Sequence, residues 1–370
     1  MVIVAPREFQ PVRLRHARQL RGTRQHELAK QLGLSAAAIS QFESGAATPG
    51  DETVQRIAMA LGCLPSFFAR RPQPEIDAKP FFRRRRATPA VELDRAQAYA
   101  LVLSDIALRI ERDIELPPST LDLRLRADDA TAVADVERCA GEARTAWRMG
   151  HGPIPNVVRL LEARGAIVTA VGAFDRRLDA FSLRAGHRPI VVLCSDSGAA
   201  ARRRFDAAHE LAHLLLHAAP QEANSIQEQQ AHRFAAALLM PAEAVDPWLP
   251  RRSNQLDLLE EGSRVWGVSM QALLYRARTV GSISEDGYRR VMRRMSAAGW
   301  RTREPVELGP PEAPDLLRQA VDALPAAGSS LGRIAEELGL PAGRVRRMLS
   351  VPEQREEAGG GEVVALRGGS

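Results

Sequence analysis

The sequence predicts a multidomain, mainly α-helical protein, in which a helical domain comes first, an α+β domain with a small sheet follows, and a helical region ends the chain. Three observations support this. The 370 residues exceed the usual size of one domain. Most of the chain repeats apolar residues at the three- and four-residue spacing of amphipathic helices. Between residues 166 and 195 the period changes to that of short strands.

The composition is that of an ordinary globular protein, with 45% hydrophobic and 26% charged residues, which excludes disorder as the main state. No run of ~18 apolar residues exists, and the apolar start is shorter than the ~7-residue core of a signal peptide. We therefore expect a cytoplasmic protein without membrane contact. Cys63, Cys139 and Cys194 lie far apart without a CxxC pair, so we expect them to be buried apolar residues rather than metal ligands.

The net charge of +6 is unevenly distributed. Residues 1–90 contain 15 Lys and Arg against 7 Asp and Glu, a balance of +8, so the remaining 280 residues sum to −2. This predicts a nucleic-acid partner for the N-terminal module alone. It also disfavours a peptidase whose N-terminal domain merely recruits another protein.

Residues 13–62 contain four predicted helices with glycine-containing turns between them. Thr23 is placed to cap the second helix, which ends at Gly33. Ser35 is placed to cap the third helix, and the fourth starts near Asp51. Two short helices joined by such a turn form a helix-turn-helix.

The motifs TRQHELA, ISQFESG and the final LG make this stretch resemble the lambda-repressor-like, or XRE, helix-turn-helix family over roughly 60 residues. The resemblance implies a third helix in the major groove of a double-stranded DNA operator, bound by a homodimer, and places Gln25 at a phosphate. The positions facing base edges would be Ser35, Ala36, Ala37, Ser40 and Gln41. Because alanine offers only apolar contact, Gln41 is the main predicted base reader. The alternative is a four-helix bundle used for protein contacts.

Basic residues around this module are further candidates for DNA contact. Those in the helices are Arg13, Arg15, Arg18, Arg21 and Arg24. A solvated charged face would show the same pattern. Residues 70–90 are rich in proline and arginine and predict a linker, which Phe81 and Phe82 anchor to a neighbouring domain. Its four arginines, 83–86, either contact the DNA backbone or stay hydrated.

The middle of the chain changes from helices to strands and back. Helical spacing extends over residues 91–114 and 130–150, and a shorter helix is predicted over 155–165. Three short strands are predicted over residues 166–172, 179–184 and 189–195. An exposed edge of such a sheet can bind an extended peptide by strand addition, although the sequence does not say which strand is the edge.

Four of the eight histidines, His209, His213, His217 and His232, fall within 24 residues after these strands. Positions i and i+4 of a helix lie above one another, so His209 and His213 can bind one metal ion. Glu210 lies about 100° around the helix, where it can take a proton from a metal-activated water. The alternative is a helix that merely contains histidines.

A third ligand is predicted on the next helix. Glu228 shares a face with small apolar residues, which would let its helix approach closely. The alternative for Glu228 is a favourable place at the positive end of its own helix. Asp206 and Glu222 are weaker candidates because neither lies on an apolar stripe. His217 is expected to be structural; His232 would assist the oxyanion, support a ligand, or lie on the surface.

The motifs DAFSL, PIVVL, RRFDAAHELAHLLLH and EQQAHRFAAALLMP resemble the ImmA/IrrE family of zinc metallopeptidases over residues 152–241. The resemblance implies a zincin-like domain with one Zn²⁺ per chain, held by His209, His213 and Glu228, and Glu210 as the catalytic base. Members of that family cleave bacterial repressors. Ala212 replaces the glycine frequent in their HELGH motif, without loss of helix propensity.

These observations predict a bacterial transcription regulator that binds DNA and hydrolyses a peptide bond in a partner repressor or in itself, with autocleavage expected after residue 70. The alternative is a non-hydrolytic repressor that uses the peptidase fold to sense a ligand or metal. The expected regions are a DNA-binding domain (1–70), a basic linker (71–90), a helical connector (91–150), a peptidase core (151–250), a helical extension (251–305) and a helical tail ending in disorder (306–370).

Overall fold

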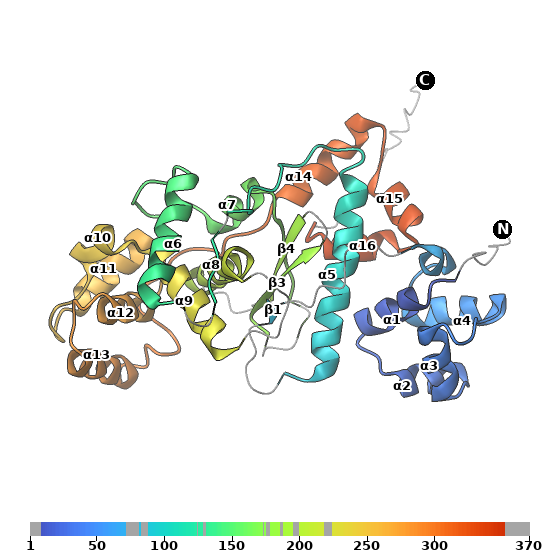
Figure 1. Cartoon of the computed structure of the whole chain (residues 1–370), viewed down its shortest axis with the longest axis horizontal. Helices are drawn as coiled ribbons and strands as arrows, with labels where there is room; N and C mark the ends of the chain where they lie inside the picture. The colour runs from blue at the N-terminus through green and yellow to red at the C-terminus, as the bar shows by residue number, and fades with distance from the viewer. Residues whose placement is uncertain are drawn as a thin grey trace, which may run out of the picture.

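The computed structural model describes residues 9–71, 81–82, 88–123, 125–128, 131–172, 174, 178–185, 188–194, 200–217 and 224–351 (Figure 1). The N-terminal helices are α1 (Pro11–Leu20), α2 (Gln25–Leu32), α3 (Ala36–Ser44), α4 (Asp51–Leu61) and the 3-10 helix η1 (Pro65–Ala69). The middle elements are β1 (Phe81–Phe82), α5 (Ala90–Ile110), α6 (Val133–Ala146), α7 (Val157–Ala163), β2 (Ile167–Ala170), β3 (Ala180–Ala185), β4 (Arg188–Leu193), α8 (Ala200–Leu216) and α9 (Ser225–Leu239). The last are α10 (Ala242–Val245), η2 (Asp246–Trp248), α11 (Leu256–Trp266), α12 (Met270–Thr279), α13 (Glu285–Ala297), α14 (Leu316–Ala323), η3 (Leu324–Ala327), α15 (Leu331–Leu338) and α16 (Ala342–Met348). The predicted mainly helical fold with one small sheet is confirmed.

The helix ends in the N-terminal module follow the predicted signals with one exception. Gly33 ends α2 in the left-handed conformation, and the Ser35 hydroxyl accepts a hydrogen bond from Ala38 N at 3.1 Å. The prediction that Thr23 caps α2 is wrong, because Arg24 occupies the N-cap position. Thr23 N instead donates to Arg18 O, which closes the end of α1, so α2 starts one residue later.

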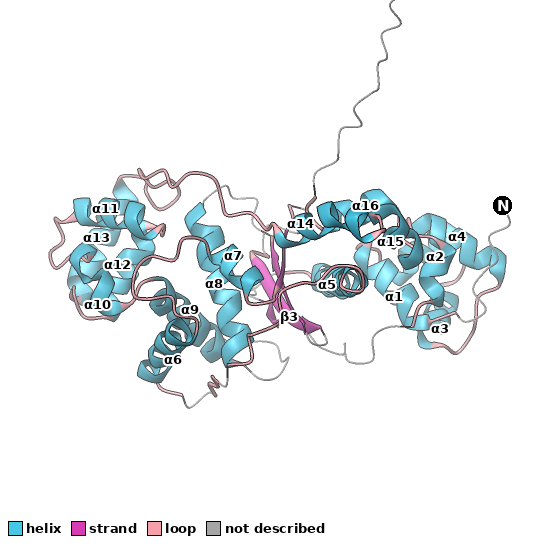
Figure 2. Ribbon diagram, turned by 90° about the horizontal axis from the view of Figure 1, so that it is seen from above, coloured by secondary structure: helices cyan, strands magenta, loops and turns pink. Residues whose placement is uncertain are grey.

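The sheet has the order β1-β3-β4-β2, with β3 antiparallel to both β1 and β4, and β2 parallel to β4. Alternate residues face opposite sides, as the two-residue period of a strand requires. Ile190 and Val192 of β4 join the core that contains α5, whereas Val191 and Leu193 join the core that contains α8. The sheet therefore separates the helices on its two sides (Figure 2).

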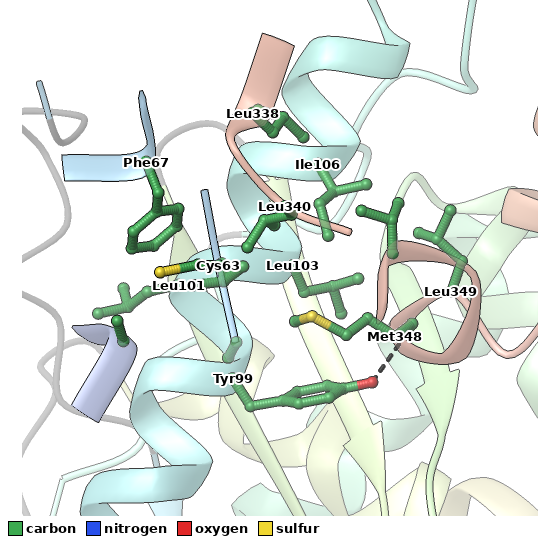
Figure 3. Packing of buried hydrophobic residues seen from close by; sticks show 14 of the residues in the cluster. Cys63, Phe67, Tyr99, Leu101, Leu103, Ile106, Leu338, Leu340, Met348 and Leu349 are labelled. Atoms are coloured by element: carbon green, nitrogen blue, oxygen red, sulfur yellow. Dashed lines mark hydrogen bonds between the residues drawn. The ribbon is translucent and has the colours of Figure 1, made fainter. Parts of the chain in front are cut away.

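The core that contains α5 joins this helix, the N-terminal module and the C-terminal helices into one apolar cluster (Figure 3). The Tyr99 hydroxyl on α5 donates to Met348 O of α16 at 2.8 Å, and Leu64 N donates to Gly339 O at 2.8 Å. Gly339 ends α15 at φ 68°, and a Cβ there would lie 2.3 Å from Phe67 N, so only glycine allows this close approach. The C-terminal region is helical, as predicted, and its helices α15 and α16 pack against the N-terminal module and α5.

A buried ion pair fixes the same module to α5. Arg13, which is 2% exposed, pairs with Asp105, and its guanidinium also donates to Arg70 O at 3.0 Å and Arg71 O at 3.2 Å. Arg13 is therefore not a phosphate contact, contrary to the expectation from the charge pattern. A guanidinium buried in this way has its donors used inside the protein.

Replacing Arg13 with methionine should lower the free energy of unfolding by roughly 3–5 kcal/mol, because Asp105 is then left buried without its partner. Urea unfolding followed by circular dichroism would measure the loss. Arg15→Met, at an exposed position of the same helix, is the control and should stay within about 0.5 kcal/mol of the wild type. Equal stability of the two variants would contradict the prediction.

His16, on the same helix, should make stability depend on pH. Burial, followed by the charges of Arg13 and Arg15, lowers its pKa from 6.5 to about 3. Below pH 6.5 the unfolded chain binds a proton that the folded chain does not, so stability present above 6.5 is lost as the pH falls toward about 3. The expected slope is up to about 1.4 kcal/mol per pH unit. His16→Phe should flatten the curve in urea unfolding at several pH values; an unchanged slope would refute the assignment.

The three cysteines are buried, as predicted, and none of them forms a disulfide. No helix in the described part of the chain is both long and apolar enough to cross a membrane. The residues expected to be disordered, from 353 onward, and the arginines 83–86 lie outside the described residues.

Candidate metal and DNA-binding sites

Two histidines of α8 and one carboxylate of α9 converge on one point. The Nε2 atoms of His209 and His213 lie 3.1 Å apart, and the oxygens of Glu228 lie 3.4 Å from His209 Nε2 and 3.3 Å from His213 Nε2. Around a tetrahedral Zn²⁺ with bonds of about 2.0–2.1 Å, ligand atoms lie about 3.3–3.4 Å from one another. The two carboxylate distances belong to different oxygens of Glu228; with one ligand atom taken from each residue, the three atoms lie within 4.8 Å of one another, as a group that could hold one metal ion.

Glu228 reaches this point because α9 packs closely on α8. Ala231 and Ala235 of α9 are fully buried, and such small side chains allow close helix approach. Asn224 starts the helix, with its side chain accepting from the backbone N–H groups of Ile226 and Gln227. Burial alone would raise the pKa of Glu228, but hydrogen bonds and charge from the two histidines hold it well below its ordinary value. The carboxylate is therefore charged, as metal ligation requires.

His217 orients the ligand His213 through a chain of hydrogen bonds. Gln230 Nε2 donates to Asp128 O at 2.7 Å, so Gln230 Oε1 must accept from His217 Nε2, 3.1 Å away. Nδ1 of a neutral His217 is then an acceptor, and it accepts a hydrogen bond from His213 Nδ1 at 2.9 Å. With a metal bound, this chain of hydrogen bonds would leave the lone pair of His213 Nε2 available to the ion. His217 therefore has a definite role beside the ligands, which sequence reasoning described only as structural.

Replacing His217 with phenylalanine should weaken zinc binding about 10- to 100-fold, because groups that orient a ligand contribute this much to affinity. Competition titration against a zinc chelator would measure it. Gln230→Leu, which breaks the same chain one step further out, should act in the same direction. His151→Phe, at an exposed position, is the control. Zinc affinity unchanged in both His217→Phe and Gln230→Leu would exclude the orienting role.

Glu210 is fully buried and faces the sheet. Its Oε2 accepts a hydrogen bond from the Ser182 hydroxyl of β3 at 2.7 Å. Ser182 was not singled out by sequence reasoning; the available signal is a polar residue within the apolar strand motif DAFSL. This hydrogen bond fixes the direction of the Glu210 carboxylate.

The other candidates take different places. His232 stacks against Phe205 and Tyr275, with ring centroids 4.8 and 4.9 Å away. Asp206 is buried, with its Oδ2 4.0 Å from Arg202 Nε, and is not part of the three-ligand group. Glu222 lies outside the described residues.

The third helix of the N-terminal module presents a polar and small-residue surface. Ile39 is fully buried and Phe42 packs partly buried against the core, which turns the opposite side of α3 to solvent. The predicted base-facing positions are all exposed: Ser35, Ala36, Ala37, Ser40 and Gln41. An exposed helix of this kind can enter a major groove.

Glu43, a buried residue of α3, holds two groups that were expected to face DNA. Arg18 Nη2 donates to its carboxylate at 2.9 Å, and Gln25 Nε2 donates to it at 2.8 Å. Arg18 also donates to Thr23 O at 2.8 Å, so it is an internal residue rather than a phosphate contact. Gln25 is half-buried in this network, and its contact with phosphate stays a prediction.

The fold and these side chains define a helix-turn-helix DNA-binding domain joined to a metallopeptidase-like domain, in which an HExxH helix is completed by a glutamate of the next helix. Family models agree with both parts. Residues 14–68 match the helix-turn-helix model of the XRE type, and residues 167–278 match the IrrE N-terminal-like domain of peptidase family M78. No curated protein matches the chain. The predicted resemblance to both families is confirmed.

Proposed function

We propose that the protein is a bacterial transcription regulator that binds operator DNA and hydrolyses a peptide bond with one zinc ion per chain. The observation that carries the proposal is the convergence of His209, His213 and Glu228, each of which offers one ligand atom within 4.8 Å of the others, in a donor set that zinc prefers. The exposed side of α3 supports the DNA-binding part. The homodimer expected from the family resemblance is part of the proposal.

In this proposal, the protein side chains divide the work of hydrolysis. His209, His213 and Glu228 hold the ion, which supplies Lewis-acid activation of water and of the peptide carbonyl when bound. Glu210 takes a proton from the attacking water and gives it to the leaving amine. Ser182 holds the Glu210 carboxylate in one direction by its hydrogen bond, which limits the conformations of the base before it acts.

One observation favours a second function, a repressor that senses a small molecule without cutting. A cavity of about 920 Å³ lies between α8, α9, α12 and α13. Its aromatic and imidazole walls are Phe205, His232, Tyr275, Tyr288 and Trp300. Phe205 precedes His209 by one turn and His232 follows Glu228 by one turn, so a ligand there would touch both metal-holding helices. The size and lining suit a small-molecule site.

The experiment that tests the proposed function compares metal-free and zinc-loaded full-length protein. Each is incubated with a mixture of synthetic peptides, and products are identified by mass spectrometry. Cleavage that requires zinc and disappears with a chelator is expected. Zinc binding at one per chain without cleavage of any peptide would favour the sensing repressor. A gel shift with promoter DNA, weakening as salt rises, tests the DNA-binding part.

A further inference from the structure

The outer edge of β3 lies next to the proposed catalytic carboxylate. β3 contributes Ser182, whose hydroxyl donates to Glu210 at 2.7 Å. On its inner side β3 pairs with β4 over six residues, which leaves its other edge for a further strand. An extended peptide that adds to this edge passes beside Ser182, with its backbone held by ladder hydrogen bonds.

This edge is paired with the chain's own backbone. β1 runs antiparallel to β3, with position 81 opposite Ser182 and position 82 opposite Phe181. β1 belongs to the segment that connects η1, ending at Ala69, with α5, beginning at Ala90. The residue whose hydroxyl directs Glu210 is therefore the register partner of a residue in the connection between the DNA-binding module and the rest of the chain.

β1 is also easy to exchange. Among the residues that the structure describes, β1 pairs with β3 at two positions, whereas β3 pairs with β4 at six. Because the net contribution of each ladder hydrogen bond to stability is small, a short pairing is weakly held at the edge of a sheet. Weak pairing with the edge of β3 would allow a substrate strand to bind there and a product strand to leave.

We propose that the chain's own connecting segment at β1 is a substrate of the metallopeptidase site, cut within one residue of Phe81. This inference rests on the proposed function. Water adds its oxygen to the carbonyl carbon, the C–N bond breaks, and the products are a new carboxylate and a new amino terminus. The proton that Glu210 takes from water goes to the leaving amine, so no further reactant is needed.

The cut breaks the chain between the DNA-binding module and the peptidase domain, but the two parts remain attached by non-covalent contacts. The DNA-binding module stays attached through the buried Arg13–Asp105 pair and through Leu64 N, which donates to Gly339 O. Both contacts lie in the continuous core that joins this module to α5 and the C-terminal helices. The nicked protein should therefore elute as one species under native conditions and give two fragments under denaturing conditions.

The test uses full-length, zinc-loaded protein, followed over time by intact-mass and denaturing-gel measurements, with Glu210→Gln as the matched control. We expect two fragments that meet within one residue of Phe81, absent in Glu210→Gln. Cutting within one molecule predicts a rate constant independent of protein concentration. A synthetic peptide with the sequence of residues 76–87 should also be cut, and a scrambled peptide of the same composition should not.

The outcomes separate this inference from the proposed function. If zinc-loaded protein cleaves other peptides of a mixture but leaves its own chain and the 76–87 peptide intact, β1 is not a substrate and the proposed function stands. If zinc-loaded protein cleaves no peptide at all, the proposed function fails and this inference fails with it. A cut that persists in Glu210→Gln comes from another protease and overturns the inference.

Discussion

Replacing Glu228 with alanine should remove stoichiometric zinc from the purified protein. Protein ligands contribute about 10–16 kcal/mol to structural zinc sites, so the loss of one of three ligands should cost several kcal/mol and weaken binding on the order of 10³-fold. The variant would keep only two of the three ligands, His209 and His213. Elemental mass spectrometry should find about one zinc per wild-type chain and almost none in the variant.

The matched control is Glu243→Ala, because Glu243 is a carboxylate in the first turn of the next helix, α10, and is not part of the three-ligand group. It should keep its zinc. Circular dichroism of Glu228→Ala should show an unchanged helix content, since the apolar stripe of α9 remains. Equal zinc content in wild type and Glu228→Ala would exclude this residue as a ligand.

Local elements of the fold were predictable because their signals are local. Gly33 and Ser35 mark helix ends through backbone conformation and capping, and both act where the sequence places them. The packing of α15 and α16 on the DNA-binding module was not predictable in this way. It depends on the backbone contact of Gly339 with Phe67, which joins positions about 270 residues apart and has no periodicity.

Charge pattern was a weaker guide than spacing. The arginines of α1 look alike in sequence, yet Arg13 lies buried against Asp105, Arg18 is bound to Glu43, and Arg15 is exposed. All three have a partner on another helix, since Arg15 also donates to Glu43 O at 3.2 Å, and they differ in how deeply the guanidinium is buried. Only the assembled structure therefore shows which charges remain available to DNA.

The metal ligands were predictable because each has a signal within one helix. His209 and His213 are four residues apart, and Glu228 interrupts a small apolar stripe. The supporting residues have no such signal. Ser182 meets Glu210 only because β3 packs on α8, and the role of His217 depends on Gln230 of another helix.

Replacing Glu210 with glutamine should leave zinc binding intact and lower the rate of peptide hydrolysis by about 10²–10⁴-fold, the range that a general base contributes. Glutamine has the same shape and can still accept the hydrogen bond from Ser182, but it takes no proton at neutral pH. The loss should fall on kcat, with little change in KM, because the base acts in the transition state. Peptide-cleavage assays at several substrate concentrations would give kcat and KM, and elemental analysis of the same samples would give the zinc content.

The same variant decides whether cutting serves regulation. Glu228→Ala removes metal and chemistry together, whereas Glu210→Gln is expected to keep the metal and remove only the chemistry. If regulation depends on hydrolysis, a reporter promoter should respond to the inducing condition with wild-type protein and stay repressed with Glu210→Gln. If the promoter responds normally in Glu210→Gln and fails to respond in Glu228→Ala, the metal is needed and the hydrolysis is not. That pair of results would favour the sensing repressor over the peptidase as the function of the protein. The aromatic cavity beside α8 and α9 would then be the proposed ligand site.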